Sequence, residues 1–203
     1  MNKLLSSIFF CLLLASPVFL SSCSEENDEE DEYANWQERN DAQTDQWAAG
    51  ASSGTYRKIL TYAKSESASS LANSDYIYVE EVEKGSGMES PIYTDNVRVA
   101  YRGRYIPTKS YPEGYVFDQT FLGNFDWKTA NMIDASPEGL VEGFSTALMH
   151  MHEGDRWIVH IPYQLGYGTS TSAGIRAYSD LTFDIALLEF WPQGEERGKF
   201  KSR

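Results

Sequence analysis

The stretch GLVEGFSTALMHMHEGDRWIVHIPYQLGYG, residues 139–168, combines the periodicity of a helix with that of a strand. Four apolar residues in its first half are spaced at i, i+3, i+4 and i+7, and they are Phe144, Ala147, Leu148 and Met151. A short helix that begins at about Phe144 would bury all four on one face. Gly154 can adopt the left-handed conformation that ends such a helix.

The second half of the same stretch predicts a half-buried strand. Trp157, Val159 and Ile161 occupy every second position, and this period of two is typical of a strand with one face in the core. Pro162 cannot donate a hydrogen bond to a neighbouring strand, so the strand ends there. A tight loop, LGYG at residues 165–168, follows.

Three further segments have strand-like alternation: VRVAYRG at 97–103, VFD at 116–118 and LTFDIALL at 181–188. In the first of them Val97, Val99 and Tyr101 share one face. Together with the approach VEKGSG at 82–87 and the stretch 139–168, these segments follow an order that resembles the FKBP (FK506-binding-protein) family of peptidyl-prolyl isomerases. The resemblance covers residues 76–191.

This resemblance implies an α+β fold, in which an FKBP-like antiparallel half-barrel sheet wraps around one short helix. Where the helix and the concave face of the sheet separate, a pocket lined by aromatic side chains is expected. The predicted organisation is a lipoprotein signal peptide (1–22), an acidic tether (23–32), an N-terminal helical extension (33–75), the FKBP-like domain (76–193) and a polar tail (194–203).

The N-terminus has the pattern of an export signal. Lys3 precedes an apolar run over residues 4–20 that is too short and too early for a membrane-spanning helix. Leu20-Ser21-Ser22-Cys23 resembles the bacterial lipobox, in which the cysteine is lipidated, whereas the alternative is an ordinary secretory signal with a chance cysteine. Since Cys11 would leave with the signal, the mature chain would contain no disulfide.

The 203-residue chain carries a net charge of −13, and residues 24–32 contain seven acidic side chains. Such a run cannot pack into a core, so it predicts a solvated tether. Its position after Cys23 also resembles the surface-export signals of Bacteroidetes lipoproteins. The basic residues are few and scattered, which argues against a nucleic-acid partner.

Residues 33–75 are expected to form two helices separated by the glycine-containing break GASSG at 50–54. One apolar face contains Trp36 and Trp47, and a second stripe contains Tyr56, Ile59, Leu60 and Ala63. The preferred interpretation is an extension that packs on its own domain, and the alternative is a dimerisation arm. Further along, Phe125 and Trp127 can alternate on a strand within residues 121–134.

The family resemblance assigns a proline-binding pocket to named positions. Asp118, Tyr167 and Phe117 are implied as catalytic, because one acid and one hydroxyl stand among the aromatic residues. The implied substrate-binding residues are Tyr101, Phe125, Leu140, Val141, Phe144, Ile175 and Phe183. Without the resemblance, each buried aromatic residue is more simply explained as sheet core.

The implied function is peptidyl-prolyl cis-trans isomerisation by a lipoprotein that is anchored to the cell-envelope membrane through Cys23 and assists the folding of exported proteins. Proline-containing polypeptides and FK506-like ligands are the expected partners, and no cofactor or metal is required. His150, His152 and His160 are interpreted as surface residues, because their spacing does not fit a ligand set. The alternative function is that of a non-catalytic FKBP-like binding or chaperone lipoprotein.

Three departures from the family pattern bear on activity. Phe144 stands where the family usually has Trp, and Ile175-Arg176-Ala177-Tyr178 stands where relatives often have Ile-Pro-Pro. The loop 106–114 is also longer than the usual connection, so it is expected to cover part of the site.

Overall fold

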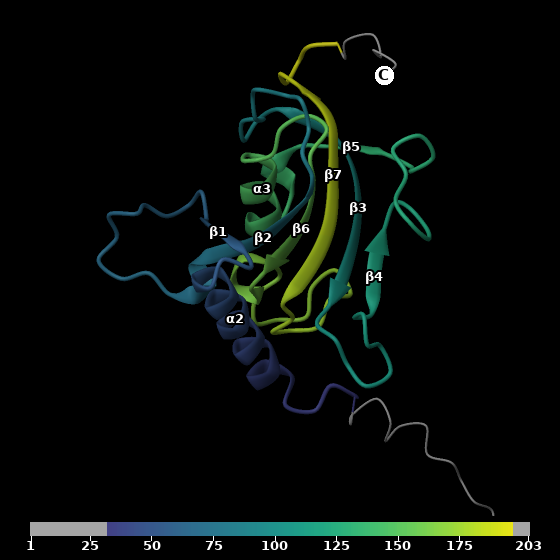
Figure 1. Ribbon diagram of the computed structural model, residues 1–203. Coiled ribbons are helices and arrows are strands. Elements are labelled where there is room, and N and C mark those ends of the chain that lie inside the picture. Colours follow the sequence, from purple (N-terminus) through teal and green to yellow (C-terminus); the bar gives the residue numbers. More distant parts are fainter. Residues whose placement is uncertain (1–31, 197–203) are drawn as a thin grey trace, which may run out of the picture.

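In the computed structural model, which describes residues 32–196, seven strands form a single antiparallel sheet (Figure 1). The strands are β1 Arg57–Leu60, β2 Tyr76–Glu83, β3 Asn96–Tyr105, β4 Val116–Gln119, β5 Ile133–Ala135, β6 Arg156–Ile161 and β7 Leu181–Trp191. Their order is β1-β2-β6-β7-β3-β4, and β5 also pairs with β3. The predicted α+β class and the half-barrel sheet are confirmed.

The helix α3, Glu142–Leu148, covers one face of this sheet. It begins two residues before Phe144, and all four residues of the predicted apolar face are buried. Gly154 has a φ of 88°, as expected of the residue that turns the chain after the helix. Its N–H donates to the carbonyl of Leu187 at 2.8 Å, which fastens this turn to β7.

The alternation predicted for β6 and β7 places their apolar residues against α3. Trp157, Val159 and Ile161 are buried in β6, and every second residue of β7 from Leu181 to Leu187 is buried with them. Because successive side chains of a strand point to opposite faces, His160 and Thr182 lie on the second face of the sheet. Three short 3₁₀ turns complete the described elements: η1 Asn73–Asp75, η2 Pro137–Gly139 and η3 Tyr163–Leu165.

The N-terminal extension is only in part a helix. The helix α2, Trp36–Ser52, runs as far as the predicted break. The prediction of a second helix after the break is wrong. Residues Arg57–Leu60 instead form β1, with Ile59 opposite Ile77 of β2. A stripe of four apolar residues does not distinguish a short helix from a short strand. Here the strand is favoured because its backbone forms hydrogen bonds with the edge of β2, which a helix could not form.

The helix α2 packs on the second face of the sheet, the face opposite α3. The ring of Trp47 stacks on that of His160, with 4.7 Å between centroids. Thr44 donates to the carboxylate of Asp180 at 2.8 Å, and the backbone N–H of Asp180 donates to the side-chain oxygen of Asn40 at 2.8 Å. The helical part of the extension is therefore docked on its own domain.

The segment between β4 and β5 does not contain the strand suggested for Phe125 and Trp127. Both rings pack with Phe121 over the small side chains Ala100 and Ala186 on the second face. The guanidinium of Arg156 lies 4.8 Å from the ring of Phe125. Because this aromatic cluster is held by the sheet surface and by cation–π contacts, the segment needs no strand partner.

The predicted signal peptide, the lipidation site Cys23, the tether up to residue 31 and the tail from residue 197 lie outside the described residues. Between residues 32 and 196, no helix combines the length and the apolar character that are needed to cross a membrane.

Candidate active site

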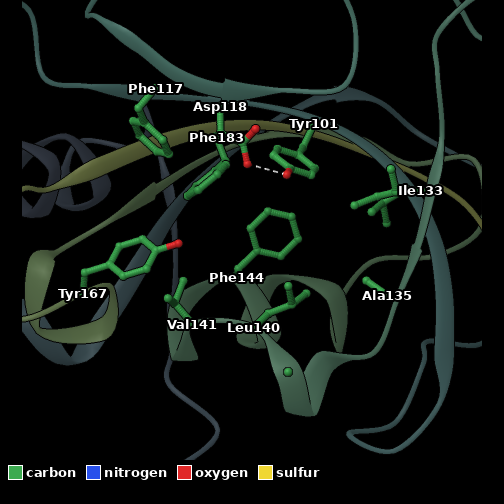
Figure 2. Close-up of a pocket in the computed structure, with 12 residues that line it drawn as sticks. Tyr101, Phe117, Asp118, Ile133, Ala135, Leu140, Val141, Phe144, Tyr167 and Phe183 are labelled. Atoms are coloured by element: carbon green, nitrogen blue, oxygen red, sulfur yellow. Dashed lines mark hydrogen bonds between the residues drawn. The ribbon is translucent and has the colours of Figure 1, made fainter. Parts of the chain in front are cut away.

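A cavity of about 320 Å³ opens between α3 and the concave face of the sheet (Figure 2). Its lining comes from four strands, from α3 and the residues just before it, and from the loop after η3. The lining residues are Val99, Tyr101, Phe117, Asp118, Ile133, Ala135, Gly139, Leu140, Val141, Phe144, Tyr167 and Phe183. All but Asp118, Gly139 and the two tyrosine hydroxyls present apolar surface, so the cavity is suited to an apolar group.

Three aromatic rings meet at the base of the cavity. The centroid of Phe144 lies 5.0 Å from that of Phe183 and 5.8 Å from that of Tyr101, and both pairs are edge-to-face. This is the preferred geometry of aromatic pairs, because the positive edge of one ring meets the negative face of the other. Phe144 therefore forms a rigid floor, although its ring is smaller than the indole that the family pattern favours.

Gly103 in β3 makes room for the upper wall. A Cβ atom at this position would come within 2.5 Å of the Phe117 ring and 2.6 Å of the Phe183 ring. The absence of a side chain therefore lets these two rings lie directly over the strand, 5.6 Å apart and nearly perpendicular.

A carboxylate and a phenol are joined at the cavity wall. The hydroxyl of Tyr101 donates a hydrogen bond to Asp118 Oδ2 at 2.6 Å, as Figure 2 shows. Burial raises the pKa of Tyr101, and the hydrogen bond and negative charge of Asp118 raise it further. Tyr101 is therefore a neutral donor across the physiological range, and its bond to Asp118 fixes the ring in place. Asp118 itself is exposed on β4.

Tyr167 supplies the second hydroxyl. Figure 2 shows its oxygen directed into the space near Val141 and Phe183. Burial raises the pKa of Tyr167, and the charge of Asp118 acts in the same direction, so the phenol keeps its proton. Within the described part of the chain this hydroxyl has no hydrogen-bond partner, which leaves it able to donate to a bound molecule.

The structure gathers most of the residues that the family resemblance assigned. Those that line the cavity are Tyr101, Phe117, Asp118, Leu140, Val141, Phe144, Tyr167 and Phe183. Phe125 does not, because it belongs to the aromatic cluster on the second face. Ile175 does not line it either. The backbone of Ile175 pairs with that of Ser172, and this tight turn directs its side chain into the main core.

The expectation that the loop 106–114 covers part of the site is also wrong, and Arg176, which belongs to the segment that departs from the family pattern, does not reach the cavity. The guanidinium of Arg176 lies 4.0 Å from the ring centroid of Tyr33, outside the cavity lining. No residue of the loop 106–114 lines the cavity. The carbonyl of Pro107 in that loop accepts from Arg39 at 3.2 Å, so the loop leans toward α2 and leaves the site open.

Four lining residues were missed by the assignment from sequence: Val99, Ile133, Ala135 and Gly139. Val99 had a usable pattern, since it shares a strand face with Tyr101. Ile133 and Ala135 alternate on β5, but three residues are too few for a period of two to stand out. These two residues extend the cavity along β3, beyond the floor formed by Phe144.

The side chains of the histidines interact with neighbouring residues. His150 Nδ1 lies 2.8 Å from the carbonyl oxygen of Thr146. His160 was expected at the surface, but it is buried between Trp47 and the sheet, and burial lowers its pKa. Among residues 32–196, no three His, Cys, Asp or Glu side chains approach one another closely enough to hold a metal ion.

The architecture defines a class of protein, an antiparallel half-barrel with an aromatic cavity beside a short helix. Two solved structures share the fold. The crystal structure of FkpA from Escherichia coli covers 82% of this chain with a TM-score of 0.54 at 22% identity, and this chain covers 66% of it. A peptidyl-prolyl cis-trans isomerase structure from Pseudomonas syringae covers 76% with a TM-score of 0.53 at 21% identity, and 95% of it is covered.

Sequence comparison gives the family. The profile of the FKBP-type peptidyl-prolyl cis-trans isomerases matches residues 87–188, half of the chain, and the chain belongs to this family. It is 33% identical over 119 residues to the macrophage infectivity potentiator of Trypanosoma cruzi, covering 58% of this chain and 55% of that protein. It is also 33% identical over 100 residues to the FKBP-type 22 kDa peptidyl-prolyl cis-trans isomerase of Escherichia coli, covering 49% and 43%. The chain thus spans about half the length of these relatives.

Proposed function

We propose that this chain is a peptidyl-prolyl cis-trans isomerase that acts on proline-containing polypeptides. The observation that carries the proposal is the combination, in one cavity, of four aromatic walls and the Tyr167 hydroxyl, which has no hydrogen-bond partner among residues 32–196. The cavity volume of about 320 Å³ is at the small end of the range for ligand pockets, roughly 300–1,000 Å³. It accommodates a pyrrolidine ring with part of the preceding residue.

The chemistry requires only that the amide be twisted. Rotation about a peptide bond is opposed by resonance, with a barrier of roughly 18–20 kcal/mol. The twisted amide has lost its resonance and is less polar than the planar one, so an apolar cavity stabilises it relative to the ground state. Lowering the barrier by about 7 kcal/mol would accelerate the reaction roughly 10⁵-fold.

Each wall of the cavity has a role in this scheme. Phe144 contacts the proline ring from the floor of the cavity, and Phe117 and Phe183 close the cavity above it. The Tyr167 hydroxyl donates to a substrate carbonyl, which holds the chain on one side of the rotating bond. Asp118 is a positioning residue, because it fixes the ring of Tyr101 through their 2.6 Å hydrogen bond. FK506-like ligands would occupy the same cavity.

The setting that we propose is the cell envelope. The pattern around Cys23 supports cleavage of a signal peptide and attachment of lipid, and the acidic tether would separate the domain from the membrane. An enzyme held there would meet exported polypeptides before they fold. Since acyl chains anchor by burial of their methylene groups, the domain itself needs no membrane-binding surface.

The test is a protease-coupled assay with X-Pro peptides and the purified chain. Catalysis that is inhibited by an FK506-like ligand supports the proposal. The specific observation that favours a second function is Phe144, because its ring is smaller than an indole and so buries less of the substrate's proline ring. If no X-Pro peptide is isomerised, but aggregation of an unfolded protein is still suppressed, the chain is a binding or chaperone module instead.

A further inference from the structure

A second cavity, of about 250 Å³, lies on the opposite face of the sheet from the proposed isomerase site. It is bounded by α2, by the loop 106–114 and by the ends of β3, β6 and β7. Its lining includes Trp47, Arg104, Pro107, Pro112, Glu113 and His160. None of these residues lines the first cavity, so the two cavities can be tested separately.

The floor of this second cavity is a row of three side chains on neighbouring strands. Arg104 of β3 is opposite Thr182 of β7, and Thr182 is opposite His160 of β6. Side chains at directly opposite positions lie on the same face of a sheet. His160 Nδ1 is 2.9 Å from Thr182 Oγ1, and Trp47 covers the imidazole. Arg104 is the member of the row that α2 leaves uncovered.

Arg104 is exceptional among the arginines of the described residues. Arg98 and Arg156 have carboxylate partners, Arg102 donates to two carbonyls, and Arg57 lies over an aromatic ring. Within residues 32–196, the half-buried guanidinium of Arg104 has no hydrogen bond, ion pair or stacked ring. A guanidinium presents a planar fork of donors that matches a carboxylate bidentately, and this one is free to do so.

The other lining groups restrict what an anion at Arg104 can be. Burial lowers the pKa of His160, so its imidazole is neutral above pH 7 and adds no positive charge. Glu113 lines the same cavity, and its negative charge repels any anion, a doubly charged one such as phosphate about twice as strongly as a singly charged one. Trp47, Pro107 and Pro112 supply apolar walls. The volume is below the roughly 300–1,000 Å³ of pockets for drug-sized ligands.

From this arrangement we propose that the second cavity is a ligand site for a singly charged carboxylate with a planar or cyclic apolar body, about the size of one amino-acid residue. The carboxylate pairs with Arg104 and the body packs between Trp47 and the two prolines. A free aromatic acid and the C-terminal residue of a peptide both have this chemistry. The site is independent of the proposed isomerase activity.

The experiment is calorimetric titration of the full chain with three probes: benzoate, acetyl-Gly-Phe with a free carboxylate, and the same dipeptide as its amide. We expect at least one carboxylate to bind and the amide not to bind. Binding of benzoate alone identifies free acids as the source, and binding of the dipeptide alone identifies peptide ends. In either case the indole N–H resonance of Trp47 should shift.

Three variants locate the binding. Arg104→Gln should weaken it at least about tenfold, since hydrogen bonds to charged groups are among the strong ones. Lys109→Gln removes one positive charge from the same loop region, outside the cavity lining, and should leave the affinity unchanged. Tyr167→Phe should also leave it unchanged. The proposal is overturned if neither carboxylate binds, if the amide binds equally well, or if Arg104→Gln keeps the parent affinity while melting at the parent temperature.

Discussion

Asp180 makes the stability of this protein depend on pH in a direction opposite to that of most acids. Its side chain is fully buried where α2 meets the sheet, and burial raises its pKa to about 7, although hydrogen bonds from Thr44 and the Tyr163 N–H oppose the shift. A carboxyl group with a raised folded pKa stabilises the native state at low pH. That contribution is fully present below the unfolded pKa, near 3.8, and is lost as the pH rises toward 7.

The size of the effect follows from the shift. Between pH 4 and 7 the native state binds about one more proton than the unfolded state at this position, so the free energy of unfolding falls by about 1.4 kcal/mol per pH unit. Over about three units the contribution of Asp180 amounts to roughly 4 kcal/mol. His160, whose pKa burial lowers, acts in the opposite sense, since its contribution is lost as the pH falls below about 6.5.

The comparison that isolates Asp180 uses Asp180→Asn, which keeps the size of the side chain and an acceptor for the Tyr163 N–H. Urea unfolding of the parent and the variant should be measured from pH 5 to pH 8. The stability of the parent relative to the variant should fall across this range, and the variant should be the more stable protein at pH 8. A difference that does not change with pH would refute the buried, proton-binding Asp180.

Three further predictions concern the packing of the helix, the cavity wall and the anchor. Trp47→Ala uncovers His160 and should lower the free energy of unfolding, measured by urea denaturation, by about 3–5 kcal/mol. A loss below about 1 kcal/mol would mean that α2 is not docked on the sheet. Gly103→Ala should cost about 1–3 kcal/mol and reduce isomerisation, because its Cβ displaces the Phe117 and Phe183 rings; parent-like melting and activity would contradict this. Cys23→Ser should move the protein from the membrane to the soluble fraction on centrifugation, and a variant that stays with the membrane would exclude the lipid anchor.

The elements that could be predicted from sequence are those with a long, regular apolar pattern. The apolar residues around Phe144 repeat with the period of a helix, and those around Trp157 repeat with the period of a strand. Each repeat is long enough to exclude the alternative secondary structure, and a glycine separates the two. The strand from Leu181 is similarly clear. In contrast, β1 and β5 are short, and they exist because β2 and β3 offer hydrogen bonds to them, which no local pattern reports.

The limits on predicting the site have the same origin. Family motifs surround Tyr101, Phe117 and Asp118, so these three could be assigned to the site from sequence. Ile133 could not, because it lies on a strand that is too short to be recognised. Phe125 was misplaced because an aromatic residue packs equally well on either face of a sheet. The burial of Asp180 depends on Thr44, which is 136 positions away in the chain, and such a contact is visible only in three dimensions.

Docking of α2 also changes what a truncation should do. The segment 36–60 contributes Trp36 and Trp47 to the main core and β1 to the sheet, so a deletion of residues 24–72 would take away part of both. Its removal would expose Asp180 and the edge of β2.

If the aromatic cavity catalyses isomerisation with help from a hydroxyl at its rim, Tyr167→Phe should impair catalysis without loosening the fold. The substitution keeps the ring and removes an oxygen that has no partner among the described residues, so the melting temperature should not change. A neutral hydrogen bond contributes roughly 0.5–1.5 kcal/mol, so kcat/KM for an X-Pro peptide should fall several-fold. Asp118→Asn, which weakens the hold on Tyr101, should also reduce it. If both variants isomerise as fast as the parent, the assignment of this cavity as the active site is contradicted.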